Sequence, residues 1–241
     1  MPDLIRPDWP APANVHAFTT TRNGGFSHGA WGSLNLGDRC GDDPDLVKQN
    51  RKLLRTLLPG EPCWLKQVHG KNVIAWDEGR DLEPGADAIF SRQTGQVCAV
   101  LTADCLPVLF CNRAGTRVAA CHAGWRGLAA GVLEAMVSVM GSAPAELMAW
   151  LGPAIGPQSY EVGNDVYNSF MKLNIDNVTA FRRHNDRWLA DLYELARLAL
   201  ARVGVEQVSG GQYCTYSETD KFFSYRRDGE TGRIATAVWL E

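Results

Sequence analysis

Apolar residues recur along the chain with two periods, and the longer period predicts four helices. The first begins at Asp43–Pro44, a pair typical of a helix start, keeps its leucines largely on one face and stops at Pro59–Gly60. The second repeats Leu, Val and Met at a spacing of four. The last three helices are expected over 128–140, 161–172 and 188–203.

Shorter apolar runs bounded by glycine, proline or asparagine predict strands. Tight turns at Gly70–Asn72 and at Ala114–Gly115 join two pairs of them. Paired strands interspersed with single helices favour a mixed sheet in a layered α+β fold. We expect one domain, 1–241, because no repeat or long Pro/Gly linker divides the chain. The strands are expected over 64–69, 73–76, 97–102, 106–111, 117–122, 147–151, 205–209 and 233–240.

Composition narrows the class of protein. The 24 basic and 27 acidic residues give a net charge of −3, which leaves no basic surface for nucleic acid or for an anionic membrane. The first residues mix charges and prolines with apolar residues, unlike a signal peptide, and no apolar run could span a bilayer. Seven cysteines without a CxxC pair argue against a disulfide framework and a zinc knuckle, and we assign Cys40, Cys63 and Cys111 to packing. We expect a cytoplasmic monomer with a small-molecule partner.

Three side chains with metal-binding chemistry lie at the ends of expected strands. His69 ends "WLKQVHG", His122 ends "VAACHAG", and Cys105 follows a strand in "VLTADCLPV". Two imidazoles and a thiolate are ligands that zinc accepts, and three protein ligands leave a fourth position for water, as in catalytic zinc sites. Their spacing alone is not specific. The alternative is a pair of strand-end histidines with satisfied hydrogen bonds beside a buried cysteine.

Several motifs, taken together, resemble a known family. "TTRNGGFSHGAWGSLNLG", "GDDPDLVKQNR", "QVHG", "TADCLPV", "HAGWRG", "GPAIGP" and "FFSYRRD" are similar, in this order, to motifs of the YfiH-type family, also called laccase-domain or polyphenol-oxidase-like proteins. The resemblance implies an α+β fold of two packed β-sheets flanked by helices, and a zinc ion held by His69, Cys105 and His122. It also implies phosphorolysis of adenosine, inosine, guanosine and methylthioadenosine, together with deamination of adenosine.

Cys121 departs from this family, in which a small apolar residue is expected at its position. Side chains alternate between the two faces of a strand, so Cys121 is expected to point away from the face that carries His122. A fourth metal ligand from Cys121 is therefore not expected.

Other functions stay open beside nucleoside chemistry. Bacterial relatives are also associated with peptidoglycan editing, the removal of a misincorporated L-Ser from a UDP-MurNAc precursor. From the residues alone, a metal-free hydrolase with Cys105 as nucleophile and His122 or His69 as base is an alternative, as is a non-catalytic binding module. Five histidines with no His-x-His pair cannot build the copper cluster of a multicopper oxidase. The three ligands could bind one Cu2+ in vitro, so any oxidase activity would be incidental.

Phosphorolysis needs a phosphate site, and arginines beside glycine-rich backbone suit this role. Arg22 in "TTRNGG" and Arg126 in "GWRG" fit, and Arg126 stands where a helix is expected to begin. Arg51 is a weaker phosphate ligand because it lies late in the first helix. Arg22 could equally brace its loop by donating to carbonyl oxygens. Trp125, next to Arg126, is expected to stack on a purine or a sugar.

Asp104 and Asp87 are the carboxylates expected near the metal. Two roles stay open for Asp104, proton transfer and orientation of a histidine, whereas for Asp87 we favour orientation of a histidine. The zinc-deaminase signature, HxE followed by PCxxC, is absent, so deamination has no support beyond the metal itself. Phe222, Phe223 and Tyr225 could form a pocket wall, although core packing is favoured for the two phenylalanines.

Overall fold

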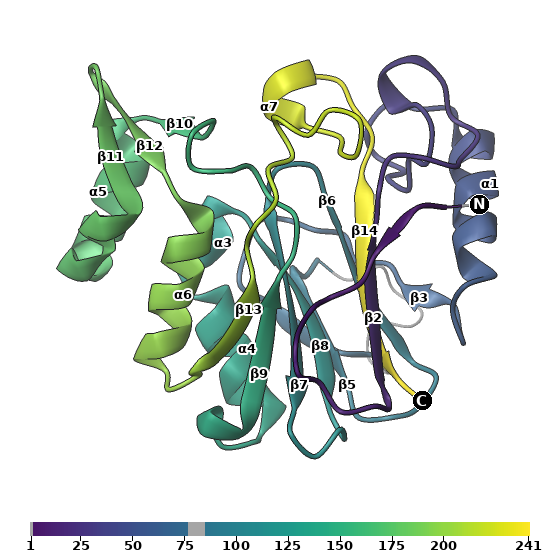
Figure 1. The fold of residues 1–241 in the computed structure, drawn as a ribbon, viewed down its shortest axis with the longest axis horizontal. Helices are drawn as coiled ribbons and strands as arrows, with labels where there is room; N and C mark the ends of the chain where they lie inside the picture. The colour runs from purple at the N-terminus through teal and green to yellow at the C-terminus, as the bar shows by residue number, and fades with distance from the viewer. Residues whose placement is uncertain (1, 77–84) are drawn as a thin grey trace.

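Two mixed β-sheets lie face to face, and helices cover the outer face of each (Figure 1). The computed structural model describes residues 2–76 and 85–241. One sheet has the order β1-β2-β14-β6-β3, with bounds Leu4–Ile5, Val15–Thr20, Ile234–Leu240, Val97–Thr102 and Pro62–Cys63. The other has the order β13-β9-β7-β8-β5-β4, with bounds Gln207–Gly210, Leu147–Leu151, Leu106–Asn112, Val118–Ala123, Ala88–Ser91 and Val73–Ala75.

The helices and a small third sheet complete the fold. The third sheet has the order β10-β12-β11, with bounds Glu161–Val162, Arg187–Ala190 and Phe181–His184. In the described part of the chain, no helix has the length and apolar character needed to cross a bilayer. The α-helices are α1 (Pro44–Arg55), α3 (Trp125–Ala130), α4 (Val132–Met140), α5 (Asn164–Leu173), α6 (Leu192–Arg202) and α7 (Tyr225–Asp228).

Side-chain alternation along the central strands builds the layers. In β7, Val108 and Phe110 face the core under α3, α4 and α6, whereas Leu109 and Cys111 face the core between the two sheets. A third core, containing Leu54, lies between the five-stranded sheet and α1. Fully burying each such side chain stabilises the fold by about 1.5–3 kcal/mol. The expected α+β class, with two packed mixed sheets flanked by helices, is confirmed.

The expected helices are present, with shifted ends. Asp43 caps α1 by accepting a hydrogen bond from the Asp45 amide at 2.8 Å, as its sequence indicated. The helix expected over 128–140 begins earlier and is broken at Gly131, whose φ of 89° interrupts the helical backbone between α3 and α4. The other two begin late, at Asn164 and Leu192, because the residues before them pair as strands β10 and β12.

The strand expected over 64–69 is wrong. Its only ladder contact in the described part of the chain is an isolated bridge between Lys66 and Gly85. Instead, the Gln67 side-chain amide donates a hydrogen bond to the Leu101 carbonyl oxygen and accepts one from the Leu101 N–H, each at 2.8 Å. β4 accordingly pairs with β5 in parallel and forms no hairpin with 64–69. The hairpin of β7 and β8 is confirmed. The sequence did not predict β1, β2, β3, β5, β10, β11 and β12.

Candidate metal centre

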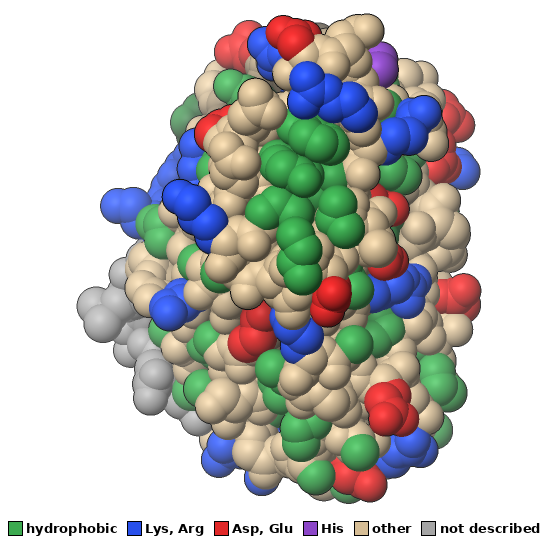
Figure 2. Space-filling model, turned by 90° about the vertical axis from the view of Figure 1, so that its left-hand side faces the viewer, with side chains coloured by type: hydrophobic (Ala, Val, Ile, Leu, Met, Phe, Trp, Pro, Cys, Tyr) green, Lys and Arg blue, Asp and Glu red, His purple; other side chains and the backbone are tan. Residues whose placement is uncertain are grey.

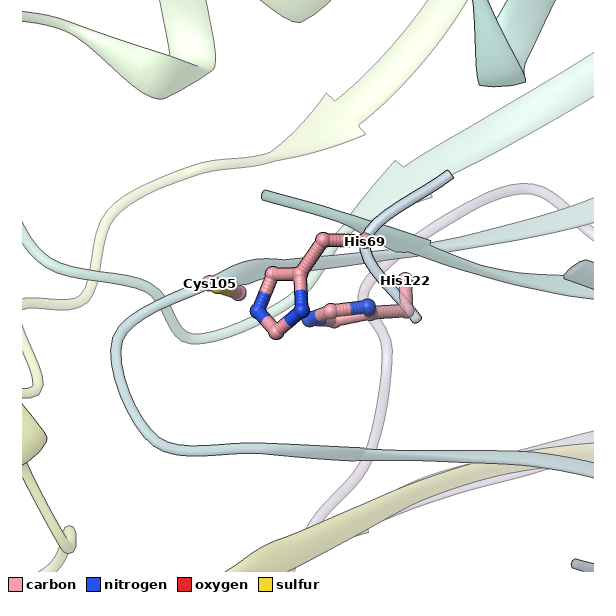
Figure 3. A group of neighbouring side chains, drawn as sticks. All are labelled: His69, Cys105 and His122. Carbon is pink, nitrogen blue, oxygen red and sulfur yellow. The ribbon is translucent and has the colours of Figure 1, made fainter. Parts of the chain in front are cut away.

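His69, Cys105 and His122 meet at one edge of the six-stranded sheet (Figure 3). His122 lies near the end of β8, and Cys105 immediately precedes β7, its antiparallel partner. His69 comes from the segment between β3 and β4. One ligand atom from each side chain lies within 4.8 Å of the others, and the two imidazole ring centres are 4.8 Å apart. The structure thus brings together the three ligands that the sequence proposed.

Asp87 fixes the imidazole of His122. It directly precedes β5, and its backbone C=O accepts the His122 N–H at 2.6 Å. Its carboxylate Oδ1 lies 2.8 Å from Nδ1 of His122, which donates the hydrogen and leaves Nε2 as the metal-binding nitrogen. Burial opposes protonation of His122, but the Cys105 thiolate and then Asp87 outweigh it and raise its pKa to about 9. The expected orienting role of Asp87 is confirmed.

The same carboxylate holds the backbone that carries His69. Oδ1 accepts the His69 amide at 2.9 Å, and Oδ2 accepts those of Val68 at 3.2 Å and Gly70 at 2.6 Å. His69 has a φ of 59°, a left-handed conformation that costs roughly 1–2 kcal/mol without such support. Burial raises the pKa of Asp87, but the hydrogen bonds from His122 and the Gly70 amide outweigh it and keep the pKa below its usual value. Asp87 therefore positions both imidazoles as an ionised carboxylate.

The two imidazoles favour the thiolate form of Cys105. Burial opposes its ionisation, but the charge of His122 and hydrogen bonds from His122 and His69 outweigh burial and lower its pKa to about 6. A thiolate is the form that binds a metal. Cys121, next to His122 in sequence, is fully buried in the core on the opposite face of β8, where burial raises the pKa of its thiol well above the usual value. It stays out of the ligand group, as expected.

Position 124, two residues after His122, has no room for a side chain. A Cβ atom there would lie 2.9 Å from Sγ of Cys105 and 3.3 Å from Cδ2 of His69. The first of these distances is shorter than carbon–sulfur contacts allow, and the second is tight. Gly124 is also the N-cap residue of α3, so that helix begins directly against the ligand group. The absent side chain leaves the space in which the thiolate and the imidazole stand.

The donor set fits a single zinc or copper ion. Zinc binds imidazole nitrogen at about 2.0–2.1 Å and thiolate at about 2.3 Å, so ligand atoms around one ion must lie less than about 5 Å apart. The observed group meets that limit. Three protein ligands leave a coordination position open, the arrangement of catalytic rather than structural zinc.

A cavity of about 450 Å³ borders the ligand group. Tyr225, a candidate for a pocket wall in the sequence, does line the cavity. Cys40, which we had assigned to packing, lines it too, so packing is not its only environment. Apart from the three metal ligands, the other lining residues had no role predicted from the sequence. The lining residues are Gly37, Asp38, Arg39, Cys40, Leu65, Gln67, His69, Leu101, Thr102, Ala103, Cys105, His122, Tyr225 and Arg233.

Arg22 and Arg51 make contacts within the protein. The Arg22 guanidinium donates to the carbonyl oxygens of Gly32 at 2.9 Å and Thr219 at 3.1 Å, the loop-bracing alternative. Arg51 donates to the Leu36 carbonyl at 3.0 Å, and its Nη2 lies 3.3 Å from Oδ1 of Asp38. Neither arginine is among the described residues that line the cavity. Binding of phosphate by either stays a prediction.

Trp125 and Arg126 are the first two residues of α3, and the Arg126 guanidinium stacks 4.5 Å above the Trp125 ring. Trp125 packs partly against the core beneath the helices, and Arg126 is exposed. Both lie outside the cavity lining within the described residues. Their predicted contacts with a ligand stay untested.

Asp104 joins a loop to helix α7 beside the site. Its Oδ1 accepts from the Thr215 hydroxyl and its Oδ2 from the Arg226 amide, each at 2.6 Å. Asp104 has a φ of 92° and only 8% of its surface exposed, and among the described residues its carboxylate makes no hydrogen bond to an imidazole. Both roles left open for Asp104, proton transfer and orientation of a histidine, stay predictions. Phe222 and Phe223 are fully buried, which confirms core packing for both.

Comparison with known proteins agrees with the motifs. A family model described as "Multi-copper polyphenol oxidoreductase laccase" matches residues 16–241. The Escherichia coli K12 protein named "Purine nucleoside phosphorylase YfiH" is 55% identical over 242 residues, covering 100% of both chains. The Pseudomonas aeruginosa protein named "Purine nucleoside phosphorylase PA4543" is 52% identical over 239 residues, covering 98% of each.

Solved structures share the whole fold. Neisseria meningitidis protein NMB0706 is 51% identical, with 99% of each chain covered and a TM-score of 0.96. YlmD from Geobacillus stearothermophilus is 31% identical, with 99% of this chain and 96% of that chain covered and a TM-score of 0.89. On the family match and these full-length relatives together, the chain belongs to the YfiH-type, laccase-like polyphenol oxidoreductase family.

Proposed function

We propose that this chain is a zinc-dependent purine nucleoside phosphorylase that acts on adenosine, inosine, guanosine and methylthioadenosine, and that it also deaminates adenosine. The observation that carries the proposal is an open His–Cys–His ligand group on the wall of a cavity large enough for a nucleoside. The names of the full-length bacterial relatives support the phosphorylase activity. The proposed unit is one domain, 1–241, active as a monomer.

Each protein group has a stated task in this proposal. His69, Cys105 and His122 hold the zinc ion, and Asp87 keeps the two imidazoles in place. A bound zinc ion would supply Lewis acidity and lower the pKa of a bound water. Asp104 anchors the loop that carries Thr215 and the helix α7 that carries Arg226, so we assign it a positioning role rather than proton transfer.

The family description contains the word "laccase", but the described residues do not offer the ligands that several copper ions would need. In residues 2–76 and 85–241, a single group of three or more metal-ligating side chains is close enough to hold an ion. Two other histidines pair with acids: His16 with Glu241 at 2.6 Å and His184 with Glu161 at 2.9 Å. One copper ion could replace zinc, and oxidase activity would then be incidental.

A second candidate is a metal-free hydrolase. The observation that favours it is the Cys105 thiol beside two imidazoles, one of which is held by a carboxylate, since this arrangement also serves nucleophilic catalysis. Its substrates would be amides or esters, and the UDP-MurNAc precursor belongs to that class. Near-stoichiometric zinc in protein purified without chelator supports the phosphorylase, whereas a metal-free protein that iodoacetamide inactivates supports the hydrolase.

Incubating the purified protein with adenosine, with and without phosphate, tests the function. Phosphorolysis releases adenine and ribose 1-phosphate only when phosphate is present, whereas deamination gives inosine in both cases. We expect both products in one chromatogram. Neither product from zinc-loaded protein would refute the proposal, and release of serine from a muramyl precursor would favour the hydrolase.

A further inference from the structure

The cavity has a second polar group besides the metal ligands. Arg39 and Arg233 supply two guanidinium groups to its wall. Asp38 is the one carboxylate among the described residues that line it, and Arg51 Nη2 lies 3.3 Å from its Oδ1. With Asp38 partly neutralised in this way, the Arg233 guanidinium gives this part of the wall a positive charge that favours an anionic ligand.

The Arg233 guanidinium is fixed along one edge and free along another. Its Nη1 donates to the carbonyl oxygens of Thr231 and Gly232, both at 2.9 Å. Its side-chain stem is close to Gly37, where a Cβ would lie 2.7 Å from Cγ of Arg233. In the described part of the chain, Nε and Nη2 donate to no protein acceptor. These two nitrogens form a parallel pair of donors, which suits two oxygens of one phosphate.

A buried hydroxyl in the same wall also lacks a partner. Thr102 is 1% exposed, lines the cavity, and its Oγ1 has no hydrogen-bond partner among the described residues. A buried hydroxyl left without a partner costs about 1–3 kcal/mol. The hydroxyl oxygen is itself buried, so the case for a polar occupant rests on the Arg233 guanidinium.

We propose that the Nε–Nη2 edge of Arg233 binds inorganic phosphate in this cavity. The assignment rests on the proposed phosphorylase function and names its anion site. In phosphorolysis a phosphate oxygen forms the bond to C1′ of the ribose while the bond from C1′ to the base nitrogen breaks. That bond's electron pair stays with the base nitrogen, which takes up the proton that the phosphate loses. Phosphate must therefore share one cavity with the nucleoside, as Arg233 allows.

The variants Arg233→Met and Arg233→Lys test the site through steady-state kinetics of adenine release. Met keeps the stem beside Gly37 but removes every donor, and Lys keeps the charge without the paired donors. We expect the KM for phosphate to rise at least tenfold in Arg233→Met and severalfold in Arg233→Lys. The KM for adenosine should stay within twofold and the zinc content should not change. Arg113→Ala is the matched control, because Arg113 lies beyond the far end of β7 from Cys105.

Three outcomes would overturn the assignment. A phosphate KM within twofold of wild type in Arg233→Met would remove Arg233 from the anion site, and a rise confined to Arg126→Ala would place phosphate at the start of α3 instead. Equal rises in both KM values would mean that Arg233 only shapes the cavity.

Direct binding separates this proposal from the proposed function. Equilibrium dialysis of radiolabelled phosphate against zinc-loaded protein needs no turnover. If wild type releases no adenine but binds phosphate and Arg233→Met does not, the anion site stands and the phosphorylase function fails. If wild type releases adenine and Arg233→Met binds phosphate as wild type does, the function stands and the anion site fails.

Discussion

Asp87→Asn tests whether one carboxylate organises the metal centre. The carboxylate is fully buried and accepts four hydrogens: His122 Nδ1–H and the His69 amide at Oδ1, and the Val68 and Gly70 amides at Oδ2. An asparagine that keeps its oxygen at Oδ1 turns an NH2 group toward the other two donors. Both backbone N–H groups then lose their acceptor.

The size of the effect follows from these contacts. Each buried donor without an acceptor costs about 1–3 kcal/mol, so the metal-free variant should be less stable to unfolding by about 2–6 kcal/mol. An orienting partner of a metal-bound histidine contributes roughly 10–100-fold to metal affinity, and we expect a loss of that size for zinc. If the amide flips, His122 loses its acceptor instead, with the same consequence for zinc.

Two measurements separate these effects. Urea unfolding in the presence of EDTA gives the stability of the metal-free protein, and competition with a chromogenic chelator gives the zinc affinity. Asp191→Asn is the control, because Asp191 also accepts two backbone amides, at 2.9 and 3.1 Å, but at the start of α6, and asparagine caps helices equally well. A zinc affinity within twofold of wild type in Asp87→Asn would refute the reasoning.

Three further predictions concern the ligands and the space around them. Replacing any one of the three metal ligands by alanine should remove the zinc with the fold intact, and full zinc content by elemental analysis in a variant would exclude that ligand. In metal-free protein, iodoacetamide should label Cys105 at a rate that rises with pH and is half-maximal near pH 6, because the thiolate is the reactive form. Cys63 has a pKa of about 11 and Cys111 a pKa of about 12, so both should stay unlabelled at pH 7. Gly124→Ala should lower zinc affinity at least tenfold by chelator competition, whereas Gly85→Ala, whose Cβ would lie 3.8 Å from Val68, should not.

The layered architecture could be predicted because its strands follow simple periodic patterns. β6, β7, β8, β9 and β14 alternate or run apolar as buried strands do, and each was expected within one residue of its observed start. Segment 64–69 follows the same pattern but is held by hydrogen bonds of side chains. The Gln67 amide bonds to the Leu101 backbone, and the Asp87 carboxylate accepts from the Val68 and Gly70 backbone amides. The spacing of apolar residues gives no information on hydrogen bonds from side chains distant in sequence. The strand wrongly predicted over 64–69 therefore could not be excluded from that spacing alone.

The metal ligands could be predicted from the sequence, whereas the arginines that line the cavity could not. His69, Cys105 and His122 each have distinctive chemistry and stand at strand ends, so three short segments were enough to propose them. Arg233 lies in the ordinary stretch before β14, and Arg39 lies among loop residues ahead of α1.

The unpaired edge of Arg233 depends on tertiary contacts. Nη1 is occupied by carbonyl oxygens of residues 231 and 232, and the stem fits against Gly37, a glycine far away in sequence. Arg126, by contrast, has the sequence features of an anion ligand, glycine neighbours and a helix start, yet its guanidinium stacks on Trp125 outside the cavity wall described here. Among the described residues, both guanidinium groups keep donors without a protein acceptor, so the donors alone do not separate the two arginines. Their places do: Arg233 lines the cavity that the metal ligands share, and Arg126 does not, so we propose Arg233 rather than Arg126 for phosphate.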